Sequence, residues 1–133
     1  MTQTLDELVA VKVMGWTRCS DDCPATGTCF FVDTDGSVWF HGGIVPFHPS
    51  TRIVDAWEVV EKMKGMWVQV SYQPMSDDGM EHEKCNASFQ PVGGARALGM
   101  AQASTAPLAI TLAALRACGV TEGEIEAAQD PKQ

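Results

Sequence analysis

The sequence has few basic residues for its length. Its 133 residues include 9 Lys and Arg against 17 Asp and Glu, so the formal net charge is -8. Such an acidic surface repels phosphate backbones and anionic lipids at long range. The composition therefore argues against direct binding to nucleic acid or to a membrane surface. It fits a basic protein partner, or simply solubility.

Long hydrophobic runs are also missing. The longest apolar segment, residues 106–117, is too short to span a bilayer. The first seven residues carry no positive charge, so we expect no signal peptide and a cytosolic location. In that compartment the five cysteines are expected to be thiols or metal ligands rather than a disulfide framework.

A recognisable catalytic motif is the third absence. The sequence contains no nucleophile elbow, zinc-protease or deaminase pattern, although it has three histidines and many carboxylates. A Cys-His pair that meets only in the folded protein stays open. We therefore expect a protein that is not an enzyme.

The hydrophobic pattern predicts one α+β domain over residues 1–120, followed by an acidic tail or short helix at 121–133. Thr4 and Glu7 form a capping box before a first helix. Ser50 or Thr51 is expected to cap a second helix, which places Trp57 on its buried side. Thr105 caps a third helix that is apolar nearly all round.

Two hairpins are expected between the helices. Residues 29–32 and 38–41 flank a turn sequence, and residues 66–73 and 80–90 make a second pair, the latter strand at an edge. Residues 91–104 are rich in Gly and Ala and are expected to form a mobile loop. The predicted order is α-β-β-α-β-β-α, with one four-stranded antiparallel sheet covered by helices.

Several segments together carry a family resemblance. They are VKVMGW at residues 11–16, AWEVVEKM at 56–63 after Pro46, ASF at 87–89, TAPLAI at 105–110 and AALRA at 113–117. As a set, in this order, they resemble the phage ABA-sandwich domain proteins. The resemblance implies a helix–sheet–helix sandwich and a bacteriophage origin, and it brings no established activity or site residues. The cysteines of residues 17–29 depart from the family pattern.

Those cysteines are candidate metal ligands. Cys19, Cys23 and Cys29, with His41 or His48 as a fourth ligand, could hold a structural zinc ion. The spacing is not the usual pair of two-residue steps. The alternative is a loop of reduced thiols, with Cys29 buried in its strand.

A second candidate site is the start of the second helix. Its free N–H groups and partial positive charge, with Ser50, Thr51 and Arg52, could hold a phosphate or carboxylate. Arg96, in a Gly-rich loop, could assist, and Phe47 or Trp67 could stack on a base. The alternative is an ordinary helix cap with an exposed arginine and a plain linker.

These features lead to a hypothesis of a phage protein that acts by binding in the cytoplasm of the infected bacterium. It would sequester a nucleotide immune signal of the host, without a cofactor. One alternative is an acidic, anti-CRISPR-like inhibitor that docks on a host defence protein. Others are a small metal-dependent hydrolase and a module that works as a homo-oligomer.

Overall fold

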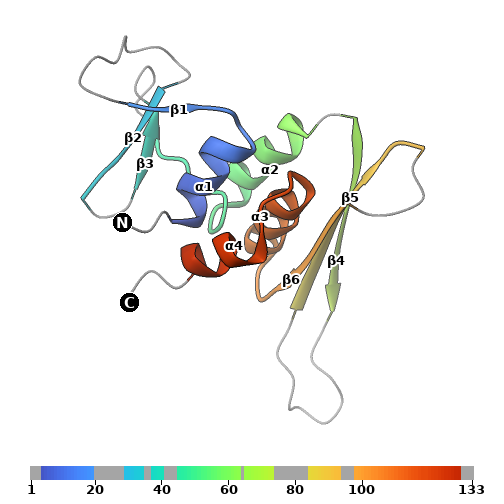
Figure 1. Ribbon diagram of the computed structural model, residues 1–133. Helices are drawn as coiled ribbons and strands as arrows, with labels where there is room; N and C mark the ends of the chain where they lie inside the picture. The colour runs from blue at the N-terminus through green and yellow to red at the C-terminus, as the bar shows by residue number, and fades with distance from the viewer. Residues whose placement is uncertain are drawn as a thin grey trace.

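The computed structural model describes residues 4–19, 29–34, 37–40, 45–63, 65–73, 84–93 and 98–129. In this part of the chain, four helices lie between two separate sheets (Figure 1). The elements are, in order, α1 (Leu5–Lys12), β1 (Thr17–Arg18), β2 (Cys29–Val32), β3 (Val38–Phe40), α2 (Ile53–Lys62), β4 (Met66–Gln73), β5 (Lys84–Pro91), β6 (Gly99–Ala103), α3 (Ala106–Ala117) and α4 (Glu122–Gln129).

The prediction of one four-stranded sheet is wrong, although the α+β class is confirmed. Each expected hairpin gains a third strand: β1 pairs in parallel with β2, and β6 pairs antiparallel with β5. The strand orders are β1-β2-β3 and β4-β5-β6. β5 is therefore a central strand rather than the edge strand that the sequence suggested.

β6 lies inside the segment that was expected to be a loop. Apart from Met100 its residues are small or polar, which gives a weak β-strand signal. The small residues are needed because α3 packs directly on this strand. A Cβ atom on Gly99 would lie 2.1 Å from the carbonyl oxygen of Ala113, a backbone atom that cannot move aside. The glycine that weakened the strand pattern is thus the one that permits the packing.

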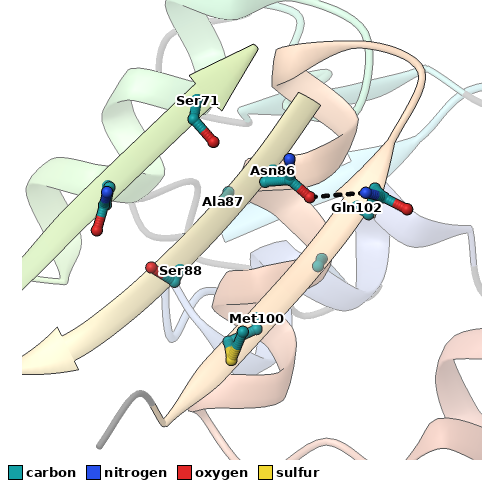
Figure 2. A pocket seen from close by; sticks show the side chains of 8 residues that line it. Ser71, Asn86, Ala87, Ser88, Met100 and Gln102 are labelled. Atoms are coloured by element: carbon teal, nitrogen blue, oxygen red, sulfur yellow. Dashed lines mark hydrogen bonds between the residues drawn. The ribbon is translucent and has the colours of Figure 1, made fainter. Parts of the chain in front are cut away.

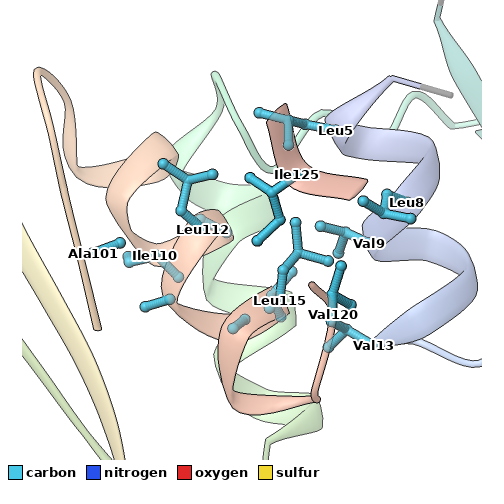
Figure 3. Packing of buried hydrophobic residues seen from close by; sticks show 14 of the residues in the cluster. Leu5, Leu8, Val9, Val13, Ala101, Ile110, Leu112, Leu115, Val120 and Ile125 are labelled. Atoms are coloured by element: carbon cyan, nitrogen blue, oxygen red, sulfur yellow. The ribbon is translucent and has the colours of Figure 1, made fainter. Parts of the chain in front are cut away.

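The helix α3 is the centre of the hydrophobic core. Its residues Ile110 and Leu115 are fully buried. Leu115 points toward Val9 of α1 and Ile125 of α4, and Ile110 lies on the other side of α3, beside Ala101 of β6 (Figure 3). One side of α3 covers β5 and β6. No described helix covers the opposite face of that sheet, so the helix–sheet–helix order implied by the resemblance is not what this half of the molecule shows.

The predicted helix starts have mixed outcomes. The hydroxyl of Thr4 accepts a hydrogen bond from the Glu7 N–H at 3.1 Å, and that of Thr105 accepts one from Leu108, so both caps are confirmed. Thr121 caps α4 in the same way, which gives the short helix rather than a tail over Glu122–Gln129. None of the described helices is long and apolar enough to cross a membrane.

The prediction for α2 is wrong in two respects. Its N-cap residue is Arg52, not Ser50 or Thr51, and no side chain caps it. Trp57 is 48% exposed rather than buried. The buried stripe of α2 is narrow and made of smaller residues, including Ala56 and Val59, because the helix lies close to α3.

Candidate functional site

The start of α2, where an anion site was predicted, is occupied by the protein's own carboxylates. Asp6 of α1 accepts a hydrogen bond from the Ser50 N–H at 2.9 Å, and its second oxygen lies 3.3 Å from Nδ1 of His48. Asp55 accepts one from the His48 N–H at 2.8 Å. Both carboxylates are buried, at 8% and 5% exposure. The N–H groups of His48 and Ser50, in the turn that leads into α2, are therefore already satisfied by these carboxylates.

The side chains around this helix start add little to an anion site. Arg52 is exposed, and its Nη1 lies 3.7 Å from Oδ2 of Asp55. Thr51 is also exposed, and its N–H donates to the carbonyl of His48. Arg96 lies outside the described residues. The structure thus brings Ser50, Thr51 and Arg52 together, but around two buried negative charges.

The two predicted stacking residues lie in different environments. Phe47 is 1% exposed and packs against the rings of Trp16 and Phe40, with centroids 4.7 Å and 6.0 Å away. Its ring therefore has no face open to a base, which removes it from the candidate site. Trp67, on β4, is 69% exposed and stays available.

The predicted zinc ligands fall partly outside the described residues. Cys23 and His41 are not described, and Cys19 is half-buried at the end of β1. Cys29 is buried and disulfide-bonded, so in this state its sulfur is not a thiolate that could bind zinc. The expectation of reduced thiols is thus wrong for Cys29. Zinc binding stays a prediction, which metal analysis of the purified protein would check.

A second candidate site is the outer face of the β4-β5-β6 sheet, on the side away from α3. Polar side chains alternate along each strand with residues that face α3, as the period of two in a strand requires. The register aligns them in rows across the sheet, Ser71–Asn86–Gln102 and Gln69–Ser88–Met100, with Trp67 and Gln90 in the next row. We call these residues the outer face.

The outer face is hollowed along its centre. A shallow depression of about 380 Å³ is lined by Gln69, Ser71, Asn86, Ser88, Met100 and Gln102, together with Ala87 and Ala101 (Figure 2). The amide of Gln102 donates to the side-chain oxygen of Asn86 at 2.9 Å. This bond holds two of the polar groups in place across neighbouring strands.

The chemistry of the outer face is polar without charge. Its amides and hydroxyls can donate and accept hydrogen bonds, and none of the described residues that line the depression is ionisable. Trp67 and Met100 add apolar surface, with exposures of 69% and 63%. Such a face can bind a partner by shape and hydrogen bonding, and the hydroxyls of Ser71 and Ser88 have no general base beside them among the described lining residues.

Sequence reasoning did not find this site because it missed β6. The strand supplies Met100 and Gln102, and without it the polar residues of β4 and β5 look like ordinary solvent-facing positions. The available signal in the sequence was the alternation of the small residues Gly99, Ala101 and Ala103 with Met100 and Gln102.

A further depression lies near the end of α2. It has a volume of about 510 Å³ and is lined by Met14, Glu58, Glu61 and Lys62. Two of these four residues are acidic and sit on an exposed helix surface, which is ordinary for a solvated face. Neither depression touches Ser50, Thr51 or Arg52.

Comparison with known proteins agrees with the resemblance noted in the sequence. No curated protein and no solved structure matches the chain. The family model of the phage ABA sandwich domain matches residues 7–115, which include every element from α2 to β6 and nearly all of α1 and α3. The chain therefore belongs to the phage ABA sandwich domain family.

Proposed function

We propose that the protein is a non-enzymatic phage protein that counters a bacterial defence by docking on a host protein through its outer face. The observation that carries this proposal is the contrast between an acidic chain, with net charge -8, and an outer face whose central depression has no charged side chain among its described lining residues. The docking would take place in the cytoplasm of the infected bacterium.

The composition of the outer face supports a protein partner. Protein interfaces are depleted of charged residues at their centre and enriched in aromatic residues and Met. Trp67 and Met100 supply that apolar surface, and Trp is frequent among the residues that dominate binding energy. The negative charge elsewhere on the chain would attract a partner with a basic surface and speed their association.

The test is rescue of phage growth. The chain is expressed in bacteria that carry one of a panel of defence systems, and these cells are challenged with a phage that lacks the corresponding gene. We expect restored plaque formation against at least one system. The double variant Trp67→Glu, Met100→Glu should lose rescue, because it places charge at the centre of the outer face.

The matched control is Trp57→Glu. This residue is another exposed tryptophan, but it lies on α2 and away from the sheet. We expect it to rescue as well as the unaltered chain. Rescue that survives the double variant at equal protein level would contradict the proposal, and so would failure to rescue against every system in the panel.

A second candidate function is sequestration of a nucleotide immune signal at the same face. The observation that favours it is the set of amide and hydroxyl groups beside Trp67. Amides can read the edges of a base, and stacking on an aromatic ring contributes about 1–3 kcal/mol per base. It ranks second because the lining residues that the structure describes offer no cation for the phosphates.

Calorimetry with cyclic di- and trinucleotides and cyclic ADP-ribose isomers separates the candidates. If sequestration is correct, one ligand should bind at micromolar concentration and lose affinity in Trp67→Ala. Loss of affinity in Arg52→Ala instead would place the ligand at the start of α2. Absence of binding by every ligand would rule out sequestration of these signals and leave protein docking.

A further inference from the structure

β4 has an open edge, at which its backbone N–H and C=O groups have no neighbouring strand among the described residues. All eight residues of β4 pair with β5 in an unbroken register, and no described strand lies on the other side of β4. Proteins usually protect such an edge with a charged side chain, a proline or a bulge, because free backbone groups there can pair with another chain. β4, with the sequence MWVQVSYQ, has none of these devices.

The hydrogen-bond pattern identifies which residues point to the open edge. In an antiparallel pair, residues alternate between those bonded to the neighbouring strand and those that face away from it. The carbonyl of Gly65 accepts a bond from the Val92 N–H at 3.2 Å. Gly65 and every second residue after it are therefore the ones that bond to β5. By this alternation the backbone groups of Val68 and Val70 face the open edge.

Pro91 supports this assignment independently. Pro91 lies opposite Met66, and by the same alternation these two residues do not bond to each other. The missing N–H of the proline therefore removes no hydrogen bond to β4. Its other side faces the line of β6, but β6 pairs with β5 only over Cys85 to Phe89. A proline is therefore tolerated in a central strand.

We propose that β4 pairs antiparallel with β4 of a second copy of this chain, so that the two β4-β5-β6 sheets form one continuous sheet. The N–H and C=O groups of Val68 and Val70 would make the bonds between the copies. Because Val68 and Val70 make these bonds, the even-numbered residues of one β4 lie opposite the even-numbered residues of the other. Residues that lie opposite each other point to the same face of the sheet. Apolar residues of one copy thus meet apolar residues of the other.

The edge itself favours a second copy as the partner, because β4 has no charged side chain and can therefore pair with its own copy without bringing like charges together. Two chains that each carry a net charge of -8 repel each other, and this repulsion is weakest where a strand has no charged side chain. The pairing would also cover Val70, which is 37% exposed on the α3 side because α3 lies mainly over β5 and β6. This inference does not depend on what the outer face binds.

The test is the mass of the purified protein by sedimentation velocity and light scattering. We expect a dimer at about 100 µM. Val70→Pro removes a donor that faces the open edge and no donor that bonds to β5. It should weaken association about 30-fold or more, because each copy loses a bond worth about 1 kcal/mol. Circular dichroism of this variant should match that of the unaltered chain.

The matched control is Gln102→Pro on the other edge of the same sheet. The backbone groups of Gln102 also point away from the neighbouring strand, β5. The variant therefore tests the effect of a proline at a sheet edge without changing β4. It should remain a dimer. Gln69→Lys, an exposed side-chain change on β4, should also weaken association without affecting folding.

Two results would overturn the proposal. One is an unaltered chain that sediments as a monomer at about 100 µM, including the case in which β4 pairs only with another protein. The other is a dimer that persists in both Val70→Pro and Gln69→Lys, which would place the contact elsewhere on the molecule.

Discussion

The two edges of the β4-β5-β6 sheet differ in how their backbone groups are satisfied. At the β6 edge, Nη1 of Arg116 donates to the carbonyl of Met100 at 2.7 Å, and Glu122 holds the same guanidinium by two bonds of 2.7 and 3.0 Å. β6 is also short, with five residues. β4 is longer and carries no such protection among the described residues.

One edge is thus partly protected by the chain's own side chains, while the other is left for a partner. α3 supplies both the packing and the arginine that close the β6 side. On the β4 side, by contrast, no described side chain reaches the backbone of Val68 or Val70.

The largest effect is expected from Gly99→Ala on the closed side. The added Cβ would lie 2.1 Å from the Ala113 oxygen and 2.4 Å from the Ala117 nitrogen, both backbone atoms of α3. We expect a loss of about 3 kcal/mol in the free energy of unfolding, measured by urea denaturation. Gly123→Ala, with nothing within 4 Å, is the control and should be neutral or slightly stabilising. Equal stability of the two variants would show that α3 does not pack on β6 as described.

The next largest effect is a difference in stability between proline variants of two neighbouring residues of β4. Ser71 is one of the residues whose backbone bonds to β5, where it pairs with Asn86. Ser71→Pro should therefore remove a hydrogen bond inside the sheet and lower the free energy of unfolding by about 2 kcal/mol. Val70→Pro should cost clearly less, because its N–H faces the open edge. Both are compared by thermal unfolding of dilute protein. Equal losses would mean that the alternation along β4 is assigned wrongly.

Arg116→Ala should open the protected edge of β6. The carbonyl of Met100 and the carboxylate of Glu122 would lose their partner, and we expect a loss of about 1 kcal/mol because both groups can turn to water. Hydrogen exchange of the β6 amides should become faster in this variant. If their exchange is unchanged, Arg116 does not protect this edge.

The smallest effect is the dependence of this same contact on pH. The hydrogen bond from Arg116 lowers the pKa of Glu122 from its ordinary value of 4.5. A lowered pKa in the folded state gives stability that is present above pH 4.5 and is lost as the pH falls through the folded-state pKa. Acid titration of the unaltered chain and of Glu122→Gln, followed by unfolding, should therefore converge at low pH. Parallel curves would exclude a role for this carboxylate.

The sequence predicted the elements whose residues have strong intrinsic preferences. The caps at Thr4 and Thr105 and the strand Met66–Gln73 follow from local chemistry, and the structure confirms them. β6 was missed because its glycine and alanines are selected by contact with α3, a property of the tertiary structure.

The candidate site at the start of α2 was less predictable for the same kind of reason. Ser50, Thr51 and Arg52 are adjacent in the sequence and suggested an anion site. Asp6, which accepts the hydrogen bond of the Ser50 N–H, lies in a different helix, so no local pattern links the two residues. The outer face likewise depends on three strands that come from separate segments.

Residue-resolved hydrogen exchange of the β4 amides at two protein concentrations tests the central claim most directly. If β4 is an edge that a second copy completes, the amides of Val68 and Val70 exchange rapidly in dilute protein and slowly in concentrated protein. The amides of Gln69 and Ser71, which bond to β5, stay protected in both. Exchange at Val68 and Val70 that is slow in dilute protein, or that does not change with concentration, would contradict the account.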